Sequence, residues 1–210
     1  MCYNFDKEKC VMKKLWILPV VCLLGACATL KTSPELIARG NGYLTDGNAK
    51  QAIYYFNKAV TVNPKNMDAY VARATAYFIN AQYKEAAADF ATAINANPNN
   101  SSLYISYAAA AAASEDYPNA LKALEMAQKI NAERPEIYFS RGNIYFLLGH
   151  YDLAIQDFSA VINAYPAAEV FNARAAALIK QGKTDTARED LAAARSGKYP
   201  ETLNEYARAQ

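Results

Sequence analysis

Histidine and cysteine, the side chains that most often build metal and catalytic sites, are nearly missing from this chain of 210 residues. His150 is the single histidine, and all four cysteines lie within the first 27 residues. A disulfide framework and a cysteine-built zinc site are therefore excluded for the rest of the chain. With no second histidine or cysteine to complete a site, His150 is interpreted as a solvated turn residue.

Excess charge and long apolar runs are missing too. Lysine and arginine number 22 against 20 aspartates and glutamates, and beyond residue 26 the two signs are equal in number. Nucleic-acid binding needs a basic surface that neutralises phosphates, so this class of function is excluded. Apolar residues make up 53% of the chain but are not gathered into several long runs, which excludes a polytopic membrane protein and leaves a globular composition.

Catalytic motifs are also missing. The sequence contains no glycine-rich phosphate loop, no nucleophile elbow and no zinc-binding helix motif. We therefore predict that the protein is not an enzyme and uses no cofactor or metal. The acidic pair Glu115 and Asp116 is interpreted as a turn that caps the helix after it.

The N-terminal segment has the organisation of an export signal. Lys13 and Lys14 precede an apolar run at 15–24 that is too short to span a bilayer as a helix, and small residues follow it. Two acidic residues in 1–11 suit such a signal poorly, so translation is expected to start at Met12.

The end of this segment, Leu24-Gly25-Ala26-Cys27, resembles the lipobox of bacterial lipoproteins. The resemblance implies that 1–26 is a signal peptide, that Cys27 becomes the lipid-modified first residue, and that 27–32 is a short tether. The alternative is an ordinary secretory signal cut near Ala26 or Ala28. Because residue 28 is not the aspartate that often retains lipoproteins in the inner membrane, we expect an outer-membrane anchor in a Gram-negative cell, with the body facing the periplasm.

A period of 34 residues runs through the remainder of the chain. Each period has a small residue, an alanine twelve residues later, and a large apolar residue four further on. The first set is Gly40, Ala74, Ala108, Gly142 and Ala175, the second is Ala52, Ala86, Ala120, Ala154 and Ala187, and the third is Phe56, Phe90, Leu124, Phe158 and Leu191. Spacings of three and four place such residues on one helical face, so each period predicts a helical hairpin.

Segments such as Arg141-Gly142-Asn143-Ile144-Tyr145 and Tyr151-Asp152-Leu153-Ala154 make this pattern resemble the tetratricopeptide repeat. The resemblance implies an all-α solenoid of about five helix-turn-helix repeats, because a single hairpin cannot bury both of its faces. The repeats are expected at 33–66, 67–100, 101–134, 135–167 and 168–200, with a short capping helix at 201–210. Gly47, Gly149 and Gly182 are expected in the hairpin turns, and Pro64, Pro98 and Pro166 after second helices.

Arginine recurs just before the small residue, and in three repeats an aspartate follows sixteen residues later. The pairs are Arg73 with Asp89, Arg141 with Asp157, and Arg174 with Asp190, whereas the third repeat has Tyr107 and Ala123 in these positions. Joint presence and joint absence predict a structural ion pair in each of the three repeats. The alternative is a row of arginines that binds anions, and Arg39, which has no such aspartate, is the candidate for a free groove cation.

By the same resemblance, the first helix of each repeat lines a concave, peptide-binding face. The candidate groove residues are Ile37, Asn41, Val71, Thr75, Phe78, Ile105, Phe139, Asn143 and Phe146, and the alanine-rich third repeat, with Ala109, should leave the middle of the groove roomy. Basic residues, with which chaperone-binding members of the family grip a carboxylate, are missing from this set. An apolar groove with amides suits an extended peptide or an amphipathic helix. The alternative is that some of these side chains only pack against neighbouring helices.

These features predict a non-enzymatic scaffold that binds an envelope protein while anchored to the outer membrane through Cys27. Lipoproteins that it resembles assist the assembly of type IV or Flp pili and their secretins, the insertion of outer-membrane barrels, or the recruitment of peptidoglycan hydrolases. Pilus or secretion assembly is favoured. The alternative is a structural envelope protein that self-associates into homo-oligomers through its terminal repeats.

Overall fold

The computed structural model describes residues 32–197, and within this range the regular secondary structure consists of ten α-helices. They are α2 (Ser33–Thr45), α3 (Ala49–Val62), α4 (Met67–Ile79), α5 (Tyr83–Ala96), α6 (Ser101–Ala113), α7 (Tyr117–Ile130), α8 (Pro135–Leu147), α9 (Tyr151–Ala164), α10 (Ala168–Lys180) and α11 (Thr184–Ser196). The expected signal peptide, the lipid site at Cys27 and the capping helix at 201–210 lie outside the described residues.

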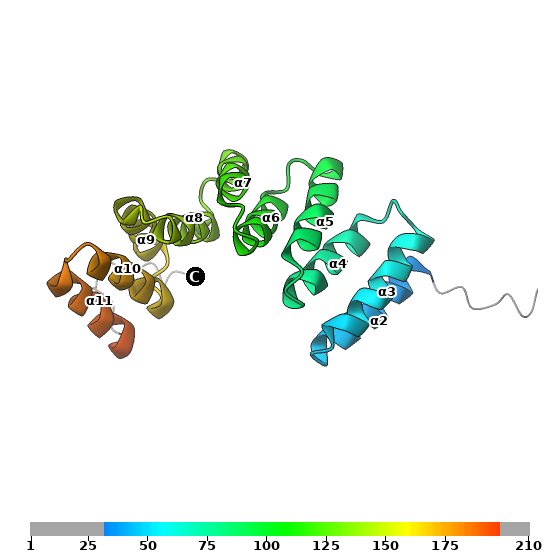
Figure 1. Ribbon diagram of the computed structural model, residues 1–210, viewed down its shortest axis with the longest axis horizontal. Coiled ribbons are helices and arrows are strands. Elements are labelled where there is room, and N and C mark those ends of the chain that lie inside the picture. Colours follow the sequence, from blue (N-terminus) through cyan, green and yellow to red (C-terminus); the bar gives the residue numbers. More distant parts are fainter. Residues whose placement is uncertain (1–31, 198–210) are drawn as a thin grey trace, which may run out of the picture.

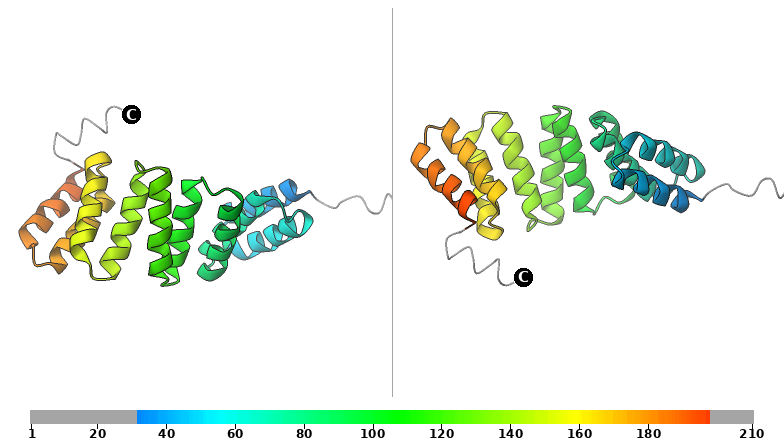
Figure 2. Two further views of the ribbon diagram at one scale, coloured as in Figure 1. Left: turned by 90° about the horizontal axis from the view of Figure 1, so that it is seen from above. Right: turned by 90° about the horizontal axis from the view of Figure 1, so that it is seen from below.

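Consecutive helices pack as five hairpins, the first of which pairs α2 with α3 and the last α10 with α11. Figure 1 shows the hairpins following one another in an arch from α2 to α11, and Figure 2 shows neighbouring helices lying side by side along the molecule. The second helix of each hairpin contacts the first helix of the hairpin that follows it. The predicted all-α solenoid is therefore confirmed.

The turn inside each hairpin contains one residue in the left-handed backbone region. Gly47, Gly149 and Gly182 occupy this position with φ of 73°, 78° and 80°. In the second and third hairpins the same position holds Ala81 at φ 59° and Glu115 at φ 65°. A side chain is strained in this region and glycine is not, so two of the five turns carry a backbone cost that the others avoid.

Short polar side chains and prolines set the helix ends. Asn48, Asn66, Asn100 and Asp116 each accept a hydrogen bond from a backbone N–H in the first turn of the helix that follows. Helices α3, α5 and α9 each end two residues before a proline, as expected because proline disfavours helical backbone in the residue preceding it. The acidic pair of the third repeat thus divides its roles: Asp116 caps α7 and Glu115 forms the turn.

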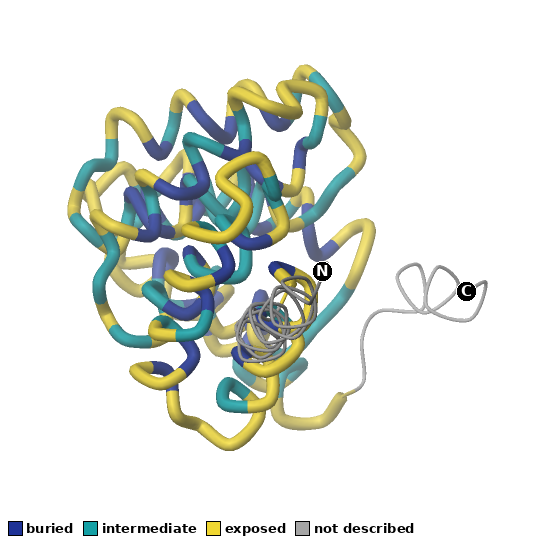
Figure 3. The backbone as a smooth tube through the Cα atoms, turned by 90° about the vertical axis from the view of Figure 1, so that its right-hand side faces the viewer, coloured by how far each residue is buried: buried dark blue, intermediate teal, exposed yellow. Residues whose placement is uncertain are grey.

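The periodic small and large residues pack the two helices of each hairpin together. Phe56 and Phe158 are fully buried, and the ring of Phe158 lies so close to Gly142 that a Cβ there would stand 2.7 Å from its Cε1 atom. Figure 3 shows short buried stretches, in dark blue, alternating with exposed ones, in yellow, along the helices. Within residues 32–197 no helix has the length and apolar character needed to cross a bilayer.

Candidate functional site

Three arginines make bidentate hydrogen bonds to an aspartate of their own repeat. Nε and Nη2 of each arginine donate to the two carboxylate oxygens at 2.7 to 2.8 Å, in the pairs Arg73–Asp89, Arg141–Asp157 and Arg174–Asp190. The aspartate side chains are only 5 to 9% exposed. The hydrogen bonds that Arg73 donates to Asp89 raise the pKa of Arg73, and those that Arg141 donates to Asp157 raise the pKa of Arg141, although burial alone would lower both.

Each of these arginines also contacts the preceding repeat. The remaining nitrogen, Nη1, donates to Asn57 Oδ1 at 2.8 Å from Arg73, to Gln128 Oε1 at 2.9 Å from Arg141, and to Ser159 Oγ at 3.0 Å from Arg174. The guanidinium group lies 5.3 to 5.7 Å from the ring centroid of an aromatic residue three positions earlier, respectively Tyr70, Tyr138 and Phe171. We call each set of arginine, aspartate and preceding-repeat acceptor an arginine clasp. Each of these arginines makes three hydrogen bonds within the fold, two of them to a buried carboxylate, which favours a structural role over an open anion-binding row.

Arg39, the candidate free groove cation, is exposed and lies over an aromatic ring. Its guanidinium lies 5.0 Å from the centroid of the Tyr55 ring, and that ring stacks on Tyr43 at 5.2 Å with an interplanar angle of 8°. Tyr55 occupies the position that holds aspartate in the clasps, so the first repeat replaces an ion pair by a cation–π contact. The exposed guanidinium group keeps its charge, and a free groove cation at Arg39 stays a prediction.

The candidate groove residues lie on the first helices α2, α4, α6 and α8. Asn41 and Thr75 are exposed, and the others are half-buried. Each phenylalanine ring packs against another aromatic ring of the fold. The ring centroids are 5.3 Å apart for Phe78 and Tyr83, 5.9 Å for Phe139 and Phe158, and 5.6 Å for Phe146 and Tyr151. The apolar candidates therefore both pack against neighbouring helices and present a part of their surface.

Two of these candidates meet at a cavity of about 200 Å³ between α4 and α6, which we call the groove pocket. It is lined by Thr75, Phe78, Phe90, Ser106 and Ala109. Phe90 comes from α5 and forms a buried floor, while Thr75 and Ser106 add two hydroxyls and no lining residue is charged. The other candidates are distributed along the first helices and do not line this cavity.

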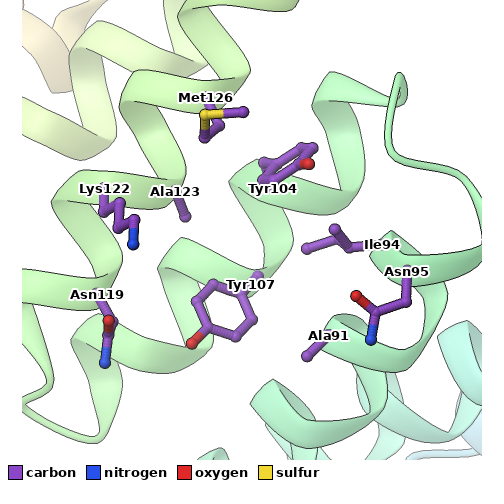
Figure 4. Close-up of a pocket in the computed structure, with 9 residues that line it drawn as sticks. All are labelled: Ala91, Ile94, Asn95, Tyr104, Tyr107, Asn119, Lys122, Ala123 and Met126. Carbon is purple, nitrogen blue, oxygen red and sulfur yellow. The ribbon is translucent and has the colours of Figure 1, made fainter.

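A second cavity, of about 250 Å³, was not anticipated from the sequence. Figure 4 shows it between the second helices α5 and α7, over α6. This seam pocket is lined by Ala91, Ile94, Asn95, Tyr104, Tyr107, Asn119, Lys122, Ala123 and Met126. The sequence did signal Tyr107 and Ala123 as departures from the repeat pattern, but as a missing ion pair rather than as a cavity.

A metal site in the described range would need a cluster of side chains that could hold the ion. No three histidine, cysteine, aspartate or glutamate side chains of residues 32–197 gather as metal ligands would. His150 is an exposed residue at the N-terminus of α9, with its ring 6.4 Å from that of Tyr145.

The geometry defines a helical-repeat module with pockets between its repeats. Two models of the tetratricopeptide repeat match the chain, over 37–101 and 108–181, and together they cover about two thirds of it. The chain therefore belongs to the tetratricopeptide-repeat family, whose fold is consistent with a scaffold for protein–protein interaction. No curated protein sequence is significantly similar to it.

Solved structures share the fold at low sequence identity. MamA from Desulfovibrio magneticus RS-1 is 15% identical with a TM-score of 0.70, and the match covers 87% of this chain and 99% of that one. Pseudomonas aeruginosa pilF is 22% identical with a TM-score of 0.68, covering 80% and 78%. YrrB, described as a TPR protein with an unusual peptide-binding site, is 23% identical with a TM-score of 0.61, covering 84% and 91%.

Proposed function

We propose that this protein is a non-enzymatic scaffold that binds an extended segment of a partner protein along its first helices. The groove pocket carries this proposal. Its size is below the range of about 300 to 1,000 Å³ that is usual for small-molecule sites, and suits one apolar side chain of a bound peptide. An aromatic floor would supply the affinity for that side chain.

Polar groups beside the pocket suit a peptide backbone. Thr75 is exposed, and its hydroxyl donates to the Val71 carbonyl at 2.9 Å, which leaves its oxygen free to accept from a peptide N–H. Asn41 and Asn143 lie at the same position in the first and fourth repeats and add amides along the same face. Pockets that alternate with backbone hydrogen bonds are the usual means of binding extended peptides.

We further propose that the scaffold is held at the outer membrane by a lipid on Cys27, with its body facing the periplasm. The lipobox-like sequence Leu24-Gly25-Ala26-Cys27 supports this anchor. The partner is then an envelope protein, and pilus or secretion assembly is the favoured process, ahead of barrel assembly and hydrolase recruitment. A short tether at 27–32 keeps the groove near the membrane and raises the local concentration of a membrane-bound partner.

Crosslinking in cells followed by affinity capture tests the groove. In Ala109→Trp an exposed alanine of the groove pocket becomes a side chain that fills it, and the partner captured by the wild-type chain should be lost. Gln156→Trp, on the exposed side of α9, adds the same bulk elsewhere and should capture normally. Equal capture by the wild-type chain and both variants would move the interface away from the groove, and capture of the chain itself alone would favour the self-associating alternative.

Cell fractionation tests the anchor separately. Cys27→Ser removes the only thiol that the lipobox resemblance would modify, so the protein should leave the outer-membrane fraction and become soluble in the periplasm. If the variant stays in the outer-membrane fraction, the proposed lipid anchor is wrong, whatever the groove binds.

A further inference from the structure

At the junction between the second and third repeats, all three residues of an arginine clasp are replaced by other residue types. In the clasp of the second repeat, Asn57, Arg73 and Asp89 lie on α3, α4 and α5. The residues 34 positions later, on α5, α6 and α7, are Ala91, Tyr107 and Ala123. All three of these residues line the seam pocket. The pocket therefore occupies the place that a clasp fills at the other junctions.

Loss of the clasp uncovers an aromatic face. At the clasped junctions the guanidinium group covers the ring of Tyr70, Tyr138 or Phe171. Tyr104 holds the same position in the third repeat, and with Tyr107 in place of arginine no guanidinium lies over it. Figure 4 shows the rings of Tyr104 and Tyr107 between α5 and α7, with Met126 and Ile94 beside them. Two rings, a thioether and an aliphatic side chain make a surface suited to another aromatic ring.

The charge at the pocket is positive. Lys122 is the one charged lining residue and forms no ion pair within residues 32–197. Glu125, one turn further on α7, is bound to Lys129 at 2.8 Å, which lowers the pKa of Glu125, and the charge of Lys122 adds to this lowering. The carboxylate that would hold an incoming cation is replaced by Ala123. An arginine or lysine from a partner would thus meet Lys122 with no carboxylate among the lining residues, while a carboxylate beside an inserted ring would be attracted to Lys122.

We propose that the seam pocket is a second binding site, for a protein segment that inserts an aromatic side chain between α5 and α7 and places a neighbouring carboxylate at Lys122. The cavity volume of about 250 Å³ suits one large side chain. Aromatic anchors in such pockets often dominate the energy of an interface. Asn95 and Asn119 lie at the pocket and supply amides for the backbone of the segment.

This site is independent of the groove. Tyr104 and Tyr107 face the seam pocket, whereas Ser106 and Ala109, two positions further along α6 in each case, line the groove pocket. A step of two residues turns about 200° around a helix, so the two pockets lie on opposite sides of α6. A client in the groove and a second segment in the seam can be bound together.

Titration of the ¹⁵N-labelled full chain with N-acetyl-tryptophan, which carries both a ring and a carboxylate, tests the site by NMR. We expect saturable shifts confined to the amides of α5, α6 and α7 around the seam pocket. N-acetyl-tryptophanamide, which lacks the carboxylate, should bind about two- to fivefold more weakly, the range expected for loss of an exposed ion pair. Shifts centred on the groove pocket, or equal binding of the acid and the amide, would overturn the proposal.

A variant that restores the clasp supplies the sharpest control. Ala91→Asn/Tyr107→Arg/Ala123→Asp rebuilds the arrangement found on α3, α4 and α5, and should abolish the shifts while the rest of the amide spectrum stays unchanged. The reverse exchange, Asn57→Ala/Arg73→Tyr/Asp89→Ala, should create a ring-binding cavity at the first junction that does not distinguish the acid from the amide, because Ala88 stands where the third repeat has Lys122. Retained shifts in a folded clasp-restored variant would show that the pocket is not where the ligand binds.

The charge is tested at Lys122, the one charged residue of the lining. Lys122→Glu reverses the charge at the pocket on an exposed position and should weaken N-acetyl-tryptophan by at least as much as removal of the ligand carboxylate does, while leaving the amide derivative unaffected. Lys50→Glu makes the same change on exposed α3 and should have no effect. If the two variants bind the acid equally well, Lys122 does not recognise the carboxylate.

Discussion

The third repeat and its clasped neighbours solve the same packing problem in different ways. In the second, fourth and fifth repeats a buried aspartate, an arginine and an acceptor of the preceding repeat fill the junction. In the third repeat the junction holds a tyrosine and two alanines around a cavity. The desolvation of a buried ion pair offsets much of its attraction, so a junction that loses every polar member together loses little stability. Removing one partner of a clasp should therefore cost much stability, whereas omitting all of its members together should cost little.

Omission also leaves room for ligands. Both pockets lie against α6, the helix that ends in the alanine run 108–113. Ala109 opens the groove pocket on one side, and the absent clasp opens the seam pocket on the other. In a solenoid each repeat contacts only its neighbours, so one repeat can lose side-chain volume without disturbing those further away.

The largest effect is expected from a substitution that removes one partner of a clasp, at Asp157. Asp157→Ala leaves the half-buried Arg141 without its two carboxylate hydrogen bonds and should lower the free energy of unfolding by about 3 kcal/mol. Arg141→Met/Asp157→Leu removes both charges together and should recover most of that loss. In the third repeat, Tyr107→Phe should change stability by less than about 0.5 kcal/mol. Urea denaturation followed by circular dichroism measures all three, and a double variant no more stable than Asp157→Ala would contradict the argument.

A smaller effect is expected where glycine meets phenylalanine. A Cβ at Gly142 would lie 2.7 Å from Phe158 Cε1, whereas the third repeat has Ala108 with the smaller Leu124. Gly142→Ala should therefore destabilise by about 1 to 2 kcal/mol through overpacking, despite the better helix propensity of alanine.

Gly42→Ala is the matched control for this change. It lies inside α2 with no atom within 4 Å of the added Cβ, so it should stabilise by up to about 1 kcal/mol. The two substitutions are chemically identical, and opposite signs in urea denaturation would isolate the contact with Phe158. Equal signs would show that packing at Gly142 does not decide its identity.

A substitution in the turn of the third hairpin should change stability by an amount similar to or smaller than that for Gly142→Ala. Glu115 has φ 65° where three other hairpins have glycine. Glu115→Gly removes the left-handed strain, which should stabilise the folded state by about 1 kcal/mol, and part of this gain is offset by the entropy that glycine adds to the unfolded chain. The midpoint of thermal unfolding should therefore rise. Glu133→Gly, in the loop after α7, is the control and should not stabilise. A lower midpoint for Glu115→Gly would show that Glu115 makes contacts that outweigh the strain.

Much of this fold could be predicted from the sequence because repetition multiplies the signal. A small residue and a large residue at fixed spacing, five times in register, predict the hairpins, and each arginine–aspartate pair of the prediction is a bidentate contact in the structure. The same reasoning did not predict the aromatic contact of Arg39, because Tyr55 was noted only as a missing aspartate.

The pockets were harder to predict for a physical reason. A cavity arises from what several side chains jointly leave empty, and Ala91, on the helix of the preceding repeat, had no part in the intra-repeat pattern. The signal of the seam pocket in the sequence is the joint loss of all three clasp residues, at Ala91, Tyr107 and Ala123. The share of each groove phenylalanine buried against Tyr83, Phe158 or Tyr151 depends on ring orientations that spacing does not encode.

The smallest expected effect concerns how the third repeat ends. Asn66 and Asn100 cap the helices that open the second and third repeats, but the same position before α8 holds Arg134, which pairs with Glu136 at 3.3 Å. The hydrogen bond from Arg134 lowers the pKa of Glu136. A lowered pKa in the folded state gives stability that is present above the ordinary glutamate pKa of about 4.3 and is lost as the pH falls through the lowered value.

Arg134→Met should therefore raise the pKa of Glu136, seen by NMR titration of its carboxyl carbon, and lower stability at pH 6 by less than about 1 kcal/mol because Glu136 is largely exposed. The stability difference between the wild-type chain and the variant should shrink as the pH falls below 4. Lys129→Met, which removes the exposed partner of Glu125, should raise the pKa of Glu125 and leave that of Glu136 unchanged. If the pKa of Glu136 does not move in Arg134→Met, the backbone N–H groups of α8, rather than the arginine, hold the carboxylate. The start of α8 would then be stabilised by a side chain that accepts from backbone N–H groups, as the starts of α4 and α6 are.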